Sequence, residues 1–227
     1  MLLIKITMIN PEISIVLPCL NEEKALGLCI DEIETAIKNN NLDAEIIVVD
    51  NASTDSSPDI ARKKKAILVS EPKRGYGNAC LSGLKQAKGK YLLMADCDGS
   101  YDFNDIPLFL ENLKENDLVI GNRFSHKELM PVLNRAGNWM IRRLLKLNGL
   151  NLEETCTGFI GAKRDKLLAL NLQKPGMEFS SEVLVKAKKN NLKITEIPVN
   201  FRERLGEPKL NRFRDGFRHF KFLLFGI

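Results

Sequence analysis

Two aspartates at the end of an apolar run are the residues whose type and spacing best suit chemistry. In the stretch YLLMADCDGSYDF, Asp96 and Asp98 are separated by one residue, so in a turning backbone their carboxylates converge. A divalent cation would offset their repulsion, and Mg²⁺ commonly takes one or two carboxylates together with substrate phosphates. A solvated acidic turn is the alternative, but the position at the end of an apolar strand favours a cation site that binds a diphosphate. The third acid, Asp102, is predicted to cap a helix that starts near Asn104.

Another carboxylate, Asp50, ends the apolar run AEIIVVD. After a strand of a βαβ unit, a carboxylate in this place often accepts hydrogen bonds from a ribose. We therefore predict that Asp50 contacts a nucleotide. The following Ser53, Thr54 and Asp55 are interpreted as turn and helix-capping residues.

The segment KRGYGNA is the third candidate for ligand binding. It supplies one cation, Arg74, and two glycines that let backbone approach a ligand at the start of a helix. A glycine-rich loop by itself is weak evidence. No GxGxxG motif follows the first predicted strand, which disfavours a nicotinamide-dependent enzyme.

The elements that must position these residues alternate between strands and helices. Runs that are apolar on both faces predict central strands of a parallel sheet, and they occur at ISIVLPCL, AEIIVVD, KAILVS, KYLLMAD and NDLVIGN. Residues 22–40 between the first two runs carry a helical apolar stripe. The alternation predicts an α/β fold with a doubly wound, mostly parallel sheet, whose ligands bind beyond the carboxyl ends of the strands. From about residue 125 we expect a long basic helix, a strand at TGFIGA, a helix near 179–190 and a strand at LKITEIPVNF.

Length and composition are those of one globular domain with a C-terminal elaboration. The chain has 227 residues, of which 44% are hydrophobic. Its five cysteines include no CxxC pair, which fits a reduced, cytoplasmic compartment. No apolar run reaches the roughly 18 residues of a transmembrane helix. The chain ends inside FKFLLFGI, which leaves open a longer parent protein.

The net charge of +5 is concentrated in two segments. Residues 126–150 and 201–227 each carry about +4, and both mix cations with aromatic or aliphatic residues at helical spacing. Basic amphipathic helices of this kind can lie in a membrane interface and contact anionic headgroups. The alternative is two helices that pack their apolar faces on the core. Nucleic acid is not expected as a partner, because no recognition motif accompanies the charge.

The motifs SIVLPCLNEE, EIIVVDNASTD, RGYGNA, ADCDGSYDF, GNRF, LNRAGN, TGF and GMEFSSEVLVKA occur in an order and spacing that resemble the family 2 glycosyltransferases. Within that family the resemblance is to the polyprenyl-phosphate or dolichol-phosphate mannose and glucose synthases, and it covers residues 13–222. It implies a GT-A (Rossmann-like) fold, a nucleotide-sugar donor such as GDP-mannose or UDP-glucose, a divalent cation (Mg²⁺ or Mn²⁺) and a polyprenyl-phosphate acceptor.

The resemblance also assigns roles to residues. It puts the donor nucleotide against Pro18, Asn21, Glu22, Asp50, Arg74, Gly75 and Asp96, and the metal on Asp96 and Asp98, with Ser100 as a further ligand in some relatives. It implies catalytic roles for Asp98, Arg123, Arg135, Glu178 and Glu182, and an acceptor-phosphate site at Arg135, Arg202, Lys209 and Arg212. The chain departs from the family pattern before TGF, where it carries Glu153 and Glu154 in place of an expected aspartate.

The chemistry of the transfer sets out what the site must do. Cleavage of the bond to a nucleoside diphosphate leaves negative charge that a cation can stabilise. In an inverting displacement, a sugar hydroxyl acceptor needs a general base, for which Glu178 and Glu182 are the candidates, whereas an ionised lipid phosphate needs only positioning. A saccharide or small-molecule acceptor, or an inactive nucleotide-sugar-binding module, are the alternatives.

For the whole chain we predict a catalytic domain at 1–200 and a basic amphipathic segment at 201–227. The expected location is the cytoplasmic face of the membrane, to which the protein would bind peripherally. The sequence predicts neither the oligomeric state nor the sugar of the donor.

Overall fold

The computed structural model describes residues 10–129, 132–209 and 212–225. Across these ranges the chain forms seven strands: β1 (Ile13–Cys19), β2 (Ala44–Asp50), β3 (Ile67–Ser70), β4 (Tyr91–Met94), β5 (Leu118–Asn122), β6 (Ile160–Lys163) and β7 (Ile194–Pro198).

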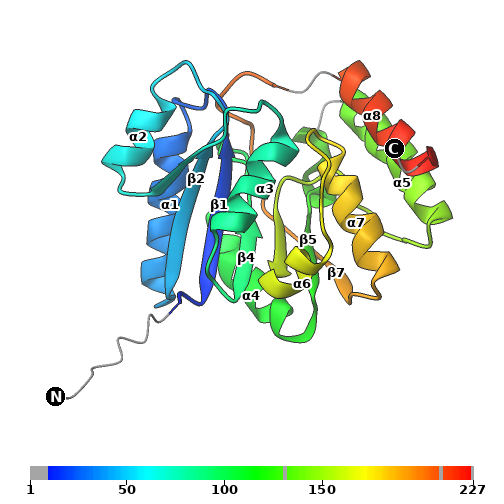
Figure 1. Cartoon of the computed structure of the whole chain (residues 1–227), viewed down its shortest axis with the longest axis horizontal. Coiled ribbons are helices and arrows are strands. Elements are labelled where there is room, and N and C mark those ends of the chain that lie inside the picture. Colours follow the sequence, from blue (N-terminus) through cyan, green and yellow to red (C-terminus); the bar gives the residue numbers. More distant parts are fainter. Residues whose placement is uncertain (1–9, 130–131, 210–211, 226–227) are drawn as a thin grey trace.

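The strands form a single sheet in the order β3-β2-β1-β4-β6-β5-β7 (Figure 1). β6 runs antiparallel to its neighbours β4 and β5, and the other described pairs are parallel. The mostly parallel sheet confirms the predicted fold class. It also brings the ends of β1 and β4, next to each other in the sheet, to the same edge.

Helices cover both faces of the sheet (Figure 1). One face packs on α1 (Leu26–Asn39), α2 (Ser57–Lys63) and α4 (Ile106–Glu115), and the other on α3 (Tyr76–Gln86), α6 (Arg164–Ala169) and α7 (Phe179–Lys189). The short 3₁₀ helices η1 (Phe103–Asp105) and η2 (Phe124–Leu129) follow β4 and β5. The result is a three-layer α/β/α arrangement.

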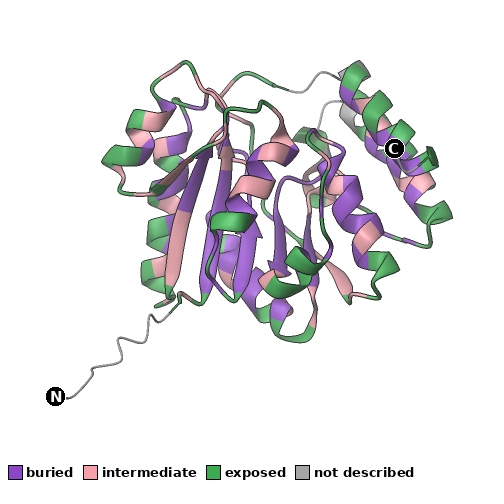
Figure 2. Ribbon diagram, viewed as in Figure 1, coloured by how far each residue is buried: buried purple, intermediate pink, exposed green. Residues whose placement is uncertain are grey.

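The alternation of side chains in β1 shows how the sheet holds two cores. Ile13, Ile15 and Leu17 lie in the core beneath α1 and α4, whereas Val16 lies in the core beneath α3. Burial is highest in the middle of the sheet (Figure 2). The prediction that every apolar run is a central strand is wrong for β3, which lies at the edge with Ile67 exposed.

The C-terminal elements extend the second core. α5 (Val132–Leu147) and α8 (Arg212–Phe225) lie side by side at the right of Figure 1, and α8 also contacts α7. Phe222 and Leu223 of α8 are buried in the same hydrophobic cluster as Val183 of α7. The boundary near residue 200 stays a prediction, but α8 shares its packing with the residues before that boundary.

None of the described helices is long and apolar enough to span a bilayer. The helix predicted at 22–40 begins at Leu26, because the residues before it are bonded to the loop after β2. Asp102 caps η1 as predicted, accepting a hydrogen bond from the backbone N–H of Asn104 at 3.0 Å.

Candidate active site

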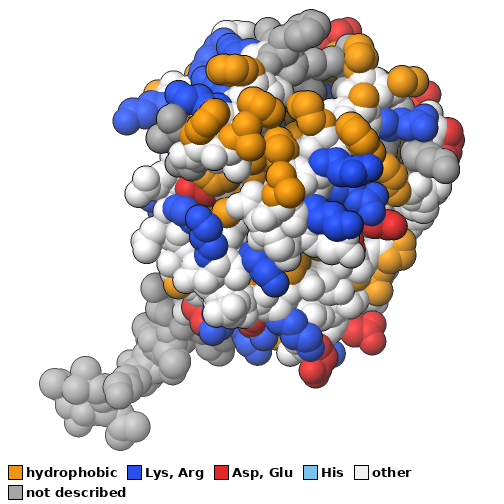
Figure 3. Space-filling model, turned by 90° about the vertical axis from the view of Figure 1, so that its right-hand side faces the viewer, with side chains coloured by type: hydrophobic (Ala, Val, Ile, Leu, Met, Phe, Trp, Pro, Cys, Tyr) orange, Lys and Arg blue, Asp and Glu red, His pale blue; other side chains and the backbone are white. Residues whose placement is uncertain are grey.

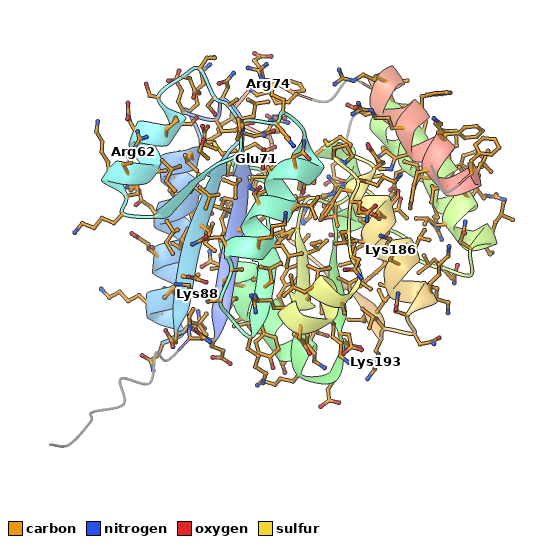
Figure 4. All side chains as sticks on the ribbon, in the orientation of Figure 1. Arg62, Glu71, Arg74, Lys88, Lys186 and Lys193 are labelled. Carbon is orange, nitrogen blue, oxygen red and sulfur yellow. The ribbon has the colours of Figure 1, made fainter. Side chains whose placement is uncertain are left out.

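A cavity of about 580 Å³ opens at the carboxyl ends of β1 and β4. Its walls come from the loop after β1 (18–22), the start of α3 (74–76), the residues after β4 (96–98) and the loop before α7 (176–177). The C-terminal part of the chain adds Arg204, Lys209, Arg214, Asp215 and Arg218. Figure 4 shows Arg74 and Glu71 at this edge of the molecule, and Lys88 and Lys193 at the opposite edge. The cavity therefore lies where ligands bind in open α/β sheets.

Asp96 lies at the base of the cavity against the backbone of Gly158. A Cβ atom on Gly158 would lie 2.0 Å from Oδ2 of Asp96, so only glycine leaves room for this carboxylate. Burial, together with the neighbouring Asp98, raises the pKa of Asp96 to about 7. The TGF motif thus shapes the acidic site from the segment just before β6.

Asp98 is held from two sides. Its Oδ1 accepts hydrogen bonds from the backbone N–H of Ser100 at 2.9 Å and from the Ser100 hydroxyl at 2.5 Å. Its Oδ2 lies 3.3 Å from Nη1 of Arg204. The hydroxyl of Ser100 therefore orients Asp98, and Ser100 does not line the cavity.

Glu22 is a third carboxylate at the same place. Its Oε1 lies 3.1 Å from Nη2 of Arg204 and 3.9 Å from Nζ of Lys209, whereas its Oε2 is buried without a hydrogen-bond partner. Burial raises the pKa of Glu22 to about 7, although the charges of Lys209 and Arg204 act in the opposite direction. Oε2 of Glu22 is thus a buried acceptor that could still receive a hydrogen bond or contact a cation.

The acids fit a divalent cation of the Mg²⁺ type. Asp96 and Asp98 present hard oxygen ligands, and the guanidinium of Arg204 now offsets the charge of the acids. Within the described ranges, no group of three or more metal-ligating side chains already converges on one point. The donor set therefore suits a cation that completes its coordination with water and substrate phosphate oxygens.

A segment that we call the strap (residues 202–206) lies over these acids. The backbone N–H groups of Arg202 and Leu205 donate to the carbonyl oxygens of Ser100 and Asp98, at 2.7 and 2.9 Å. Leu205 packs on Gly99, and Gly206 lies against Oε2 of Glu22. The strap positions Arg204 between Asp98 and Glu22.

Two loops are tied together beside the cavity. The Asn21 side chain accepts a hydrogen bond from the backbone N–H of Thr54 at 2.7 Å, and Ser53 and Asp55 accept from the backbone N–H groups of Asn21 and Glu23. Ser53, Thr54 and Asp55 thus link the loop after β2 to the loop after β1, and the N-cap residue of α2, Ser56, makes no side-chain capping bond. Asp50 accepts from the backbone N–H of Ser53 at 3.1 Å and lies just outside the cavity lining, so its contact with a nucleotide stays a prediction.

Asn51, which follows Asp50, organises the glycine-rich loop. Its side chain donates to the carbonyl oxygens of Glu71 and Lys73 and accepts from the backbone N–H of Gly75 at 2.7 Å. Arg74, which lines the cavity, donates to the Ala52 carbonyl oxygen at 3.3 Å. An amide supplies both donors and an acceptor here, which an aspartate could not do.

The glycines of this loop lie in close contact with the backbone of the loop before α7. A Cβ atom on Gly75 or Gly77 would lie 2.2 Å from the carbonyl oxygen of Pro175 or 2.0 Å from that of Lys174. Their freedom lets the start of α3 pack on the loop before α7. Gly75 also lines the cavity. That its backbone approaches a ligand stays a prediction.

Three arginines predicted near phosphates lie outside the cavity lining. Arg123 is bonded through Nε to Glu154 at 2.9 Å and through Nη2 to the Cys156 carbonyl oxygen at 2.9 Å. Arg202 pairs with Glu32 at 2.6 Å and Asp102 at 2.7 Å. Arg135 is exposed on α5.

The two candidate bases also lie outside the lining. Glu182 is buried and accepts backbone N–H groups of Gln173 and Lys174, so it anchors the loop before α7. Glu178 is buried, and its Oε1 accepts from the backbone N–H of Gly176 at 3.3 Å, while Oε2 has no hydrogen-bond partner.

The structure thus brings part of the predicted set together. The predicted residues that line the cavity are Pro18, Asn21, Glu22, Arg74, Gly75, Asp96, Asp98 and Lys209. The side chain of Arg212 lies outside the described residues. Sequence reasoning missed the lining residues Tyr76, Met177 and Arg204, and assigned Arg214 and Arg218 only to a basic helix. The signal for Arg204 was its place two residues after Arg202 in the basic segment RERLGEP.

Comparisons with known proteins identify the family of this chain. The sequence profile of Glycosyl transferase family 2 matches residues 14–168. The chain is 33% identical to the low-salt glycan biosynthesis hexosyltransferase Agl6 of Haloferax volcanii over 95% of the chain, but it spans only 54% of that relative's length. It is 32% identical to the dolichyl-phosphate hexose transferase of the same organism, over 90% of the chain and 89% of that relative.

Solved structures share the fold. Glucosyl-3-phosphoglycerate synthase of Mycobacterium tuberculosis in complex with UDP superposes with a TM-score of 0.77 at 22% identity, over 94% of this chain and 79% of that one. The same enzyme with Mn²⁺ and UDP-glucose gives a TM-score of 0.74 at 24% identity, over 94% and 78%. The chain belongs to glycosyl transferase family 2, which confirms both the predicted GT-A fold and the prediction of a glycosyltransferase.

Proposed function

We propose that this protein transfers a hexose from a nucleotide sugar to a polyprenyl phosphate, with inversion and with a divalent cation. The observation that carries the proposal is the acidic site in the cavity, where Asp96, Asp98 and Glu22 meet the guanidinium of Arg204. The name of the dolichyl-phosphate hexose transferase, which is similar over nearly its whole length, supports the acceptor class.

On the donor side, Asp96 and Asp98 would hold the cation, with Ser100 orienting Asp98. Mn²⁺ and UDP-glucose in a structurally similar enzyme support this type of donor and metal. A bound cation would act as a Lewis acid for the diphosphate leaving group. Arg74, Asn21 and Pro18 line the part of the cavity next to the β1 and β2 loops, where we place the nucleoside.

Arg204 is the cation best placed for the diphosphate. It already lies between two carboxylates, and a guanidinium can pair with phosphate oxygens in a bidentate manner. A cation held by Asp96 and Asp98 would offset the charge of Asp98 and so weaken its attraction for Arg204. Arg204 would then turn to the developing negative charge of the leaving group, where preorganised cations are most effective.

The acceptor is proposed to be a phosphate because the two bases that family resemblance implies do not line the cavity. Both predicted bases, Glu178 and Glu182, lie outside the lining, and Glu182 is engaged by backbone N–H groups. A phosphate oxygen is ionised at neutral pH and attacks without deprotonation, so it needs only positioning. A saccharide hydroxyl would need a base at the anomeric carbon.

We further propose that α5 and α8 bind an anionic membrane surface on the cytoplasmic side. Trp139 and Leu147 of α5 are 59% and 81% exposed, and Phe217 of α8 is 67% exposed. Figure 3 shows this side of the molecule, where apolar side chains gather with Lys and Arg around them. Exposed apolar patches with a basic rim suit a headgroup boundary.

Two measurements test the enzymatic proposal. Thermal shifts with UDP-glucose, GDP-mannose and UDP-N-acetylglucosamine, each with Mg²⁺ or Mn²⁺, identify the donor, and transfer to farnesyl phosphate then tests the acceptor. We expect metal-dependent stabilisation by one donor and formation of a farnesyl-phosphate-linked hexose. Donor binding that needs no metal, with no transfer to farnesyl phosphate, would contradict the proposal.

Sedimentation with vesicles tests the membrane surface. We expect the protein to bind vesicles that contain phosphatidylglycerol more tightly than phosphatidylcholine vesicles, with binding that weakens at high salt. Phe217→Ser combined with Leu224→Ser should weaken binding, whereas Leu108→Ser, at an exposed leucine on α4, should not. Equal binding by both variants would rule out this surface.

A further inference from the structure

We propose that Arg218 of α8 binds the phosphate of the acceptor, an inference that rests on the proposed transfer to a polyprenyl phosphate. Arg218 lines the cavity that holds Asp96 and Asp98, although it lies 120 residues from Asp98 in the sequence. Among the cations that sequence reasoning proposed for phosphates, Lys209 lines this cavity, whereas Arg123, Arg135 and Arg202 do not. The C-terminal helix therefore contributes an arginine to a site that these three predicted arginines do not line.

α8 presents three different faces. His219, Phe222 and Leu223 are buried against the neighbouring helices, and Phe217, Phe220 and Leu224 are exposed. The third face, formed by Arg214, Asp215 and Arg218, lines the cavity. Arg218 lies four residues after Arg214 and three after Asp215, and these spacings place its side chain on the same side of the helix as theirs.

The guanidinium of Arg218 has N–H donors available for a ligand. In the described part of the chain it makes no ion pair or hydrogen bond, whereas the acid on this wall, Asp215, lies 3.5 Å from Nε of Arg214. An arginine has five N–H donors in a fixed fork that matches a phosphate. Arg218 can therefore accept an anion without first losing a partner.

Glu178 positions this guanidinium. A Cβ atom built on Gly176 would lie 2.6 Å from Nη1 of Arg218 and 2.5 Å from Oε2 of Glu178, so both groups flank the same glycine. Oε2 of Glu178 is buried and has no hydrogen-bond partner. Its charge attracts the guanidinium toward the cavity wall, and the absent side chain of Gly176 leaves the space that both need. Glu178 is thus a positioning residue in this proposal and not a base.

The segment that carries Arg218 is fixed to the donor half of the site. His219 Nδ1 and Ser181 Oγ are hydrogen-bonded at 2.7 Å, and Nζ of Lys174 lies 5.2 Å from the centre of the Phe222 ring. The loop that contains Lys174 in turn contacts Gly77 of α3. Packing from α8 through this loop to α3 therefore sets the place of Arg218 relative to the nucleotide side of the cavity.

The neighbour of Arg218 indicates why the acceptor would be a lipid phosphate. Successive residues of a helix point about 100° apart. Arg218 faces the cavity, while Phe217 is exposed beside it. An acceptor with a phosphate attached to an apolar chain can contact both faces at once, which neither a free sugar nor a soluble phosphate ester does.

Steady-state kinetics with farnesyl phosphate in solution, without vesicles, test this role. For Arg218→Gln we expect KM for farnesyl phosphate to rise at least tenfold, with KM for the donor sugar and the metal-dependent hydrolysis of the donor unchanged. Arg218→Lys should recover part of the loss. The matched control is Lys221→Gln, an exposed cation on the same helix that does not line the cavity, and it should leave KM for farnesyl phosphate unchanged.

Three outcomes would overturn the inference. If the wild-type protein transfers to farnesyl phosphate and Arg218→Gln leaves its KM unchanged, Arg218 is not the phosphate ligand. If Lys221→Gln raises this KM as much as Arg218→Gln does, the effect is one of general charge on α8. If the wild-type protein hydrolyses the donor but transfers nothing to farnesyl phosphate, the proposed function itself fails, and this inference fails with it.

Discussion

The two walls of the cavity differ in how they are built. On the donor wall, the acids Asp96 and Asp98 directly follow β4, and Glu22 lies in the loop after β1. On the C-terminal wall, the cations Arg204 and Arg218 come from the strap and from α8. Asp96, Asp98 and Glu22 were predicted at the site from sequence and line the cavity, whereas Asp50 at the end of β2 lies outside the lining. The cations at the site were mostly not the predicted ones.

This difference shows that the place of a side chain depends on how the element that carries it is fixed in the fold. Parallel pairing of β1 with β4 fixes where these strands end relative to each other, so Asp96 can be placed from the local pattern alone. The strap and α8 have no such register. Their side chains reach the cavity only through packing against distant elements, as Leu205 does on Gly99 and His219 does on Ser181.

The largest expected effect is on the donor wall. Asp98→Ala should lower metal-dependent turnover by about 1,000-fold or more, because a cation that stabilises the leaving group contributes several kcal/mol. The matched control is Asp102→Asn, which removes an acid of the same stretch that caps η1 outside the cavity. Circular dichroism should show both variants folded. Unchanged turnover for Asp98→Ala would show that Asp98 is not needed for metal-dependent turnover.

The next effect concerns stability and distinguishes an arginine outside the cavity lining from those that line it. Arg123→Met should destabilise the fold by about 3–5 kcal/mol, because it leaves the carboxylate of Glu154 buried without its partner. Glu154 has no exposed surface, and Arg123 donates to it at 2.9 Å. Urea unfolding measures the loss, and adding Glu154→Gln should recover part of it. A fully stable Arg123→Met with impaired acceptor use would instead support the role implied by family resemblance.

Two arginines of the strap offer a sharper comparison, since they are two residues apart. Arg204→Gln should lower turnover by about 100-fold, the usual loss when one preorganised donor to developing charge is removed. Arg202→Gln should change turnover by less than about fivefold, because Arg202 pairs with Glu32 and Asp102, outside the cavity lining, and such exposed pairs contribute little. Initial rates at saturating donor measure both. Equal losses would mean that the strap acts as a unit.

The smallest effect is a pH dependence of the C-terminal wall. Burial lowers the pKa of His219 to about 4, although the charges of Glu178 and Asp215 oppose this shift. The unfolded chain therefore binds a proton below about pH 6.5 that the folded chain does not bind until about pH 4, so stability falls as the pH drops through this window. The contribution is on the order of 2 kcal/mol.

His219→Gln tests that effect, since its amide can keep a hydrogen bond to Ser181. The free energy of unfolding of this variant should fall less between pH 7 and pH 4.5 than that of the wild type. Parallel curves for the two proteins would show that His219 does not titrate in this window. Carboxyl groups also titrate in this window. The informative quantity is therefore the difference between the two curves of unfolding free energy against pH.

Much of the fold could be predicted from residues close together in sequence. Short apolar segments predicted the seven strands, and their alternation with helical stripes predicted the mostly parallel sheet. The prediction was wrong where the outcome depends on sheet order. Ile67 belongs to a run as apolar as the central ones, but only the neighbours in the sheet decide that β3 has a free edge.

The sequence by itself determined the acidic donor wall. An apolar strand that ends in Asp96 and Asp98 has its position and chemistry encoded in a few consecutive residues, because backbone hydrogen bonds between parallel strands fix the register. Only the tertiary structure decided which cations face those acids. Arginine side chains are long, and each takes the carboxylate that packing brings within reach: Glu154 for Arg123, Glu32 and Asp102 for Arg202, and Asp98 with Glu22 for Arg204. The packing of residues far apart in the chain made that choice, and no local pattern records it.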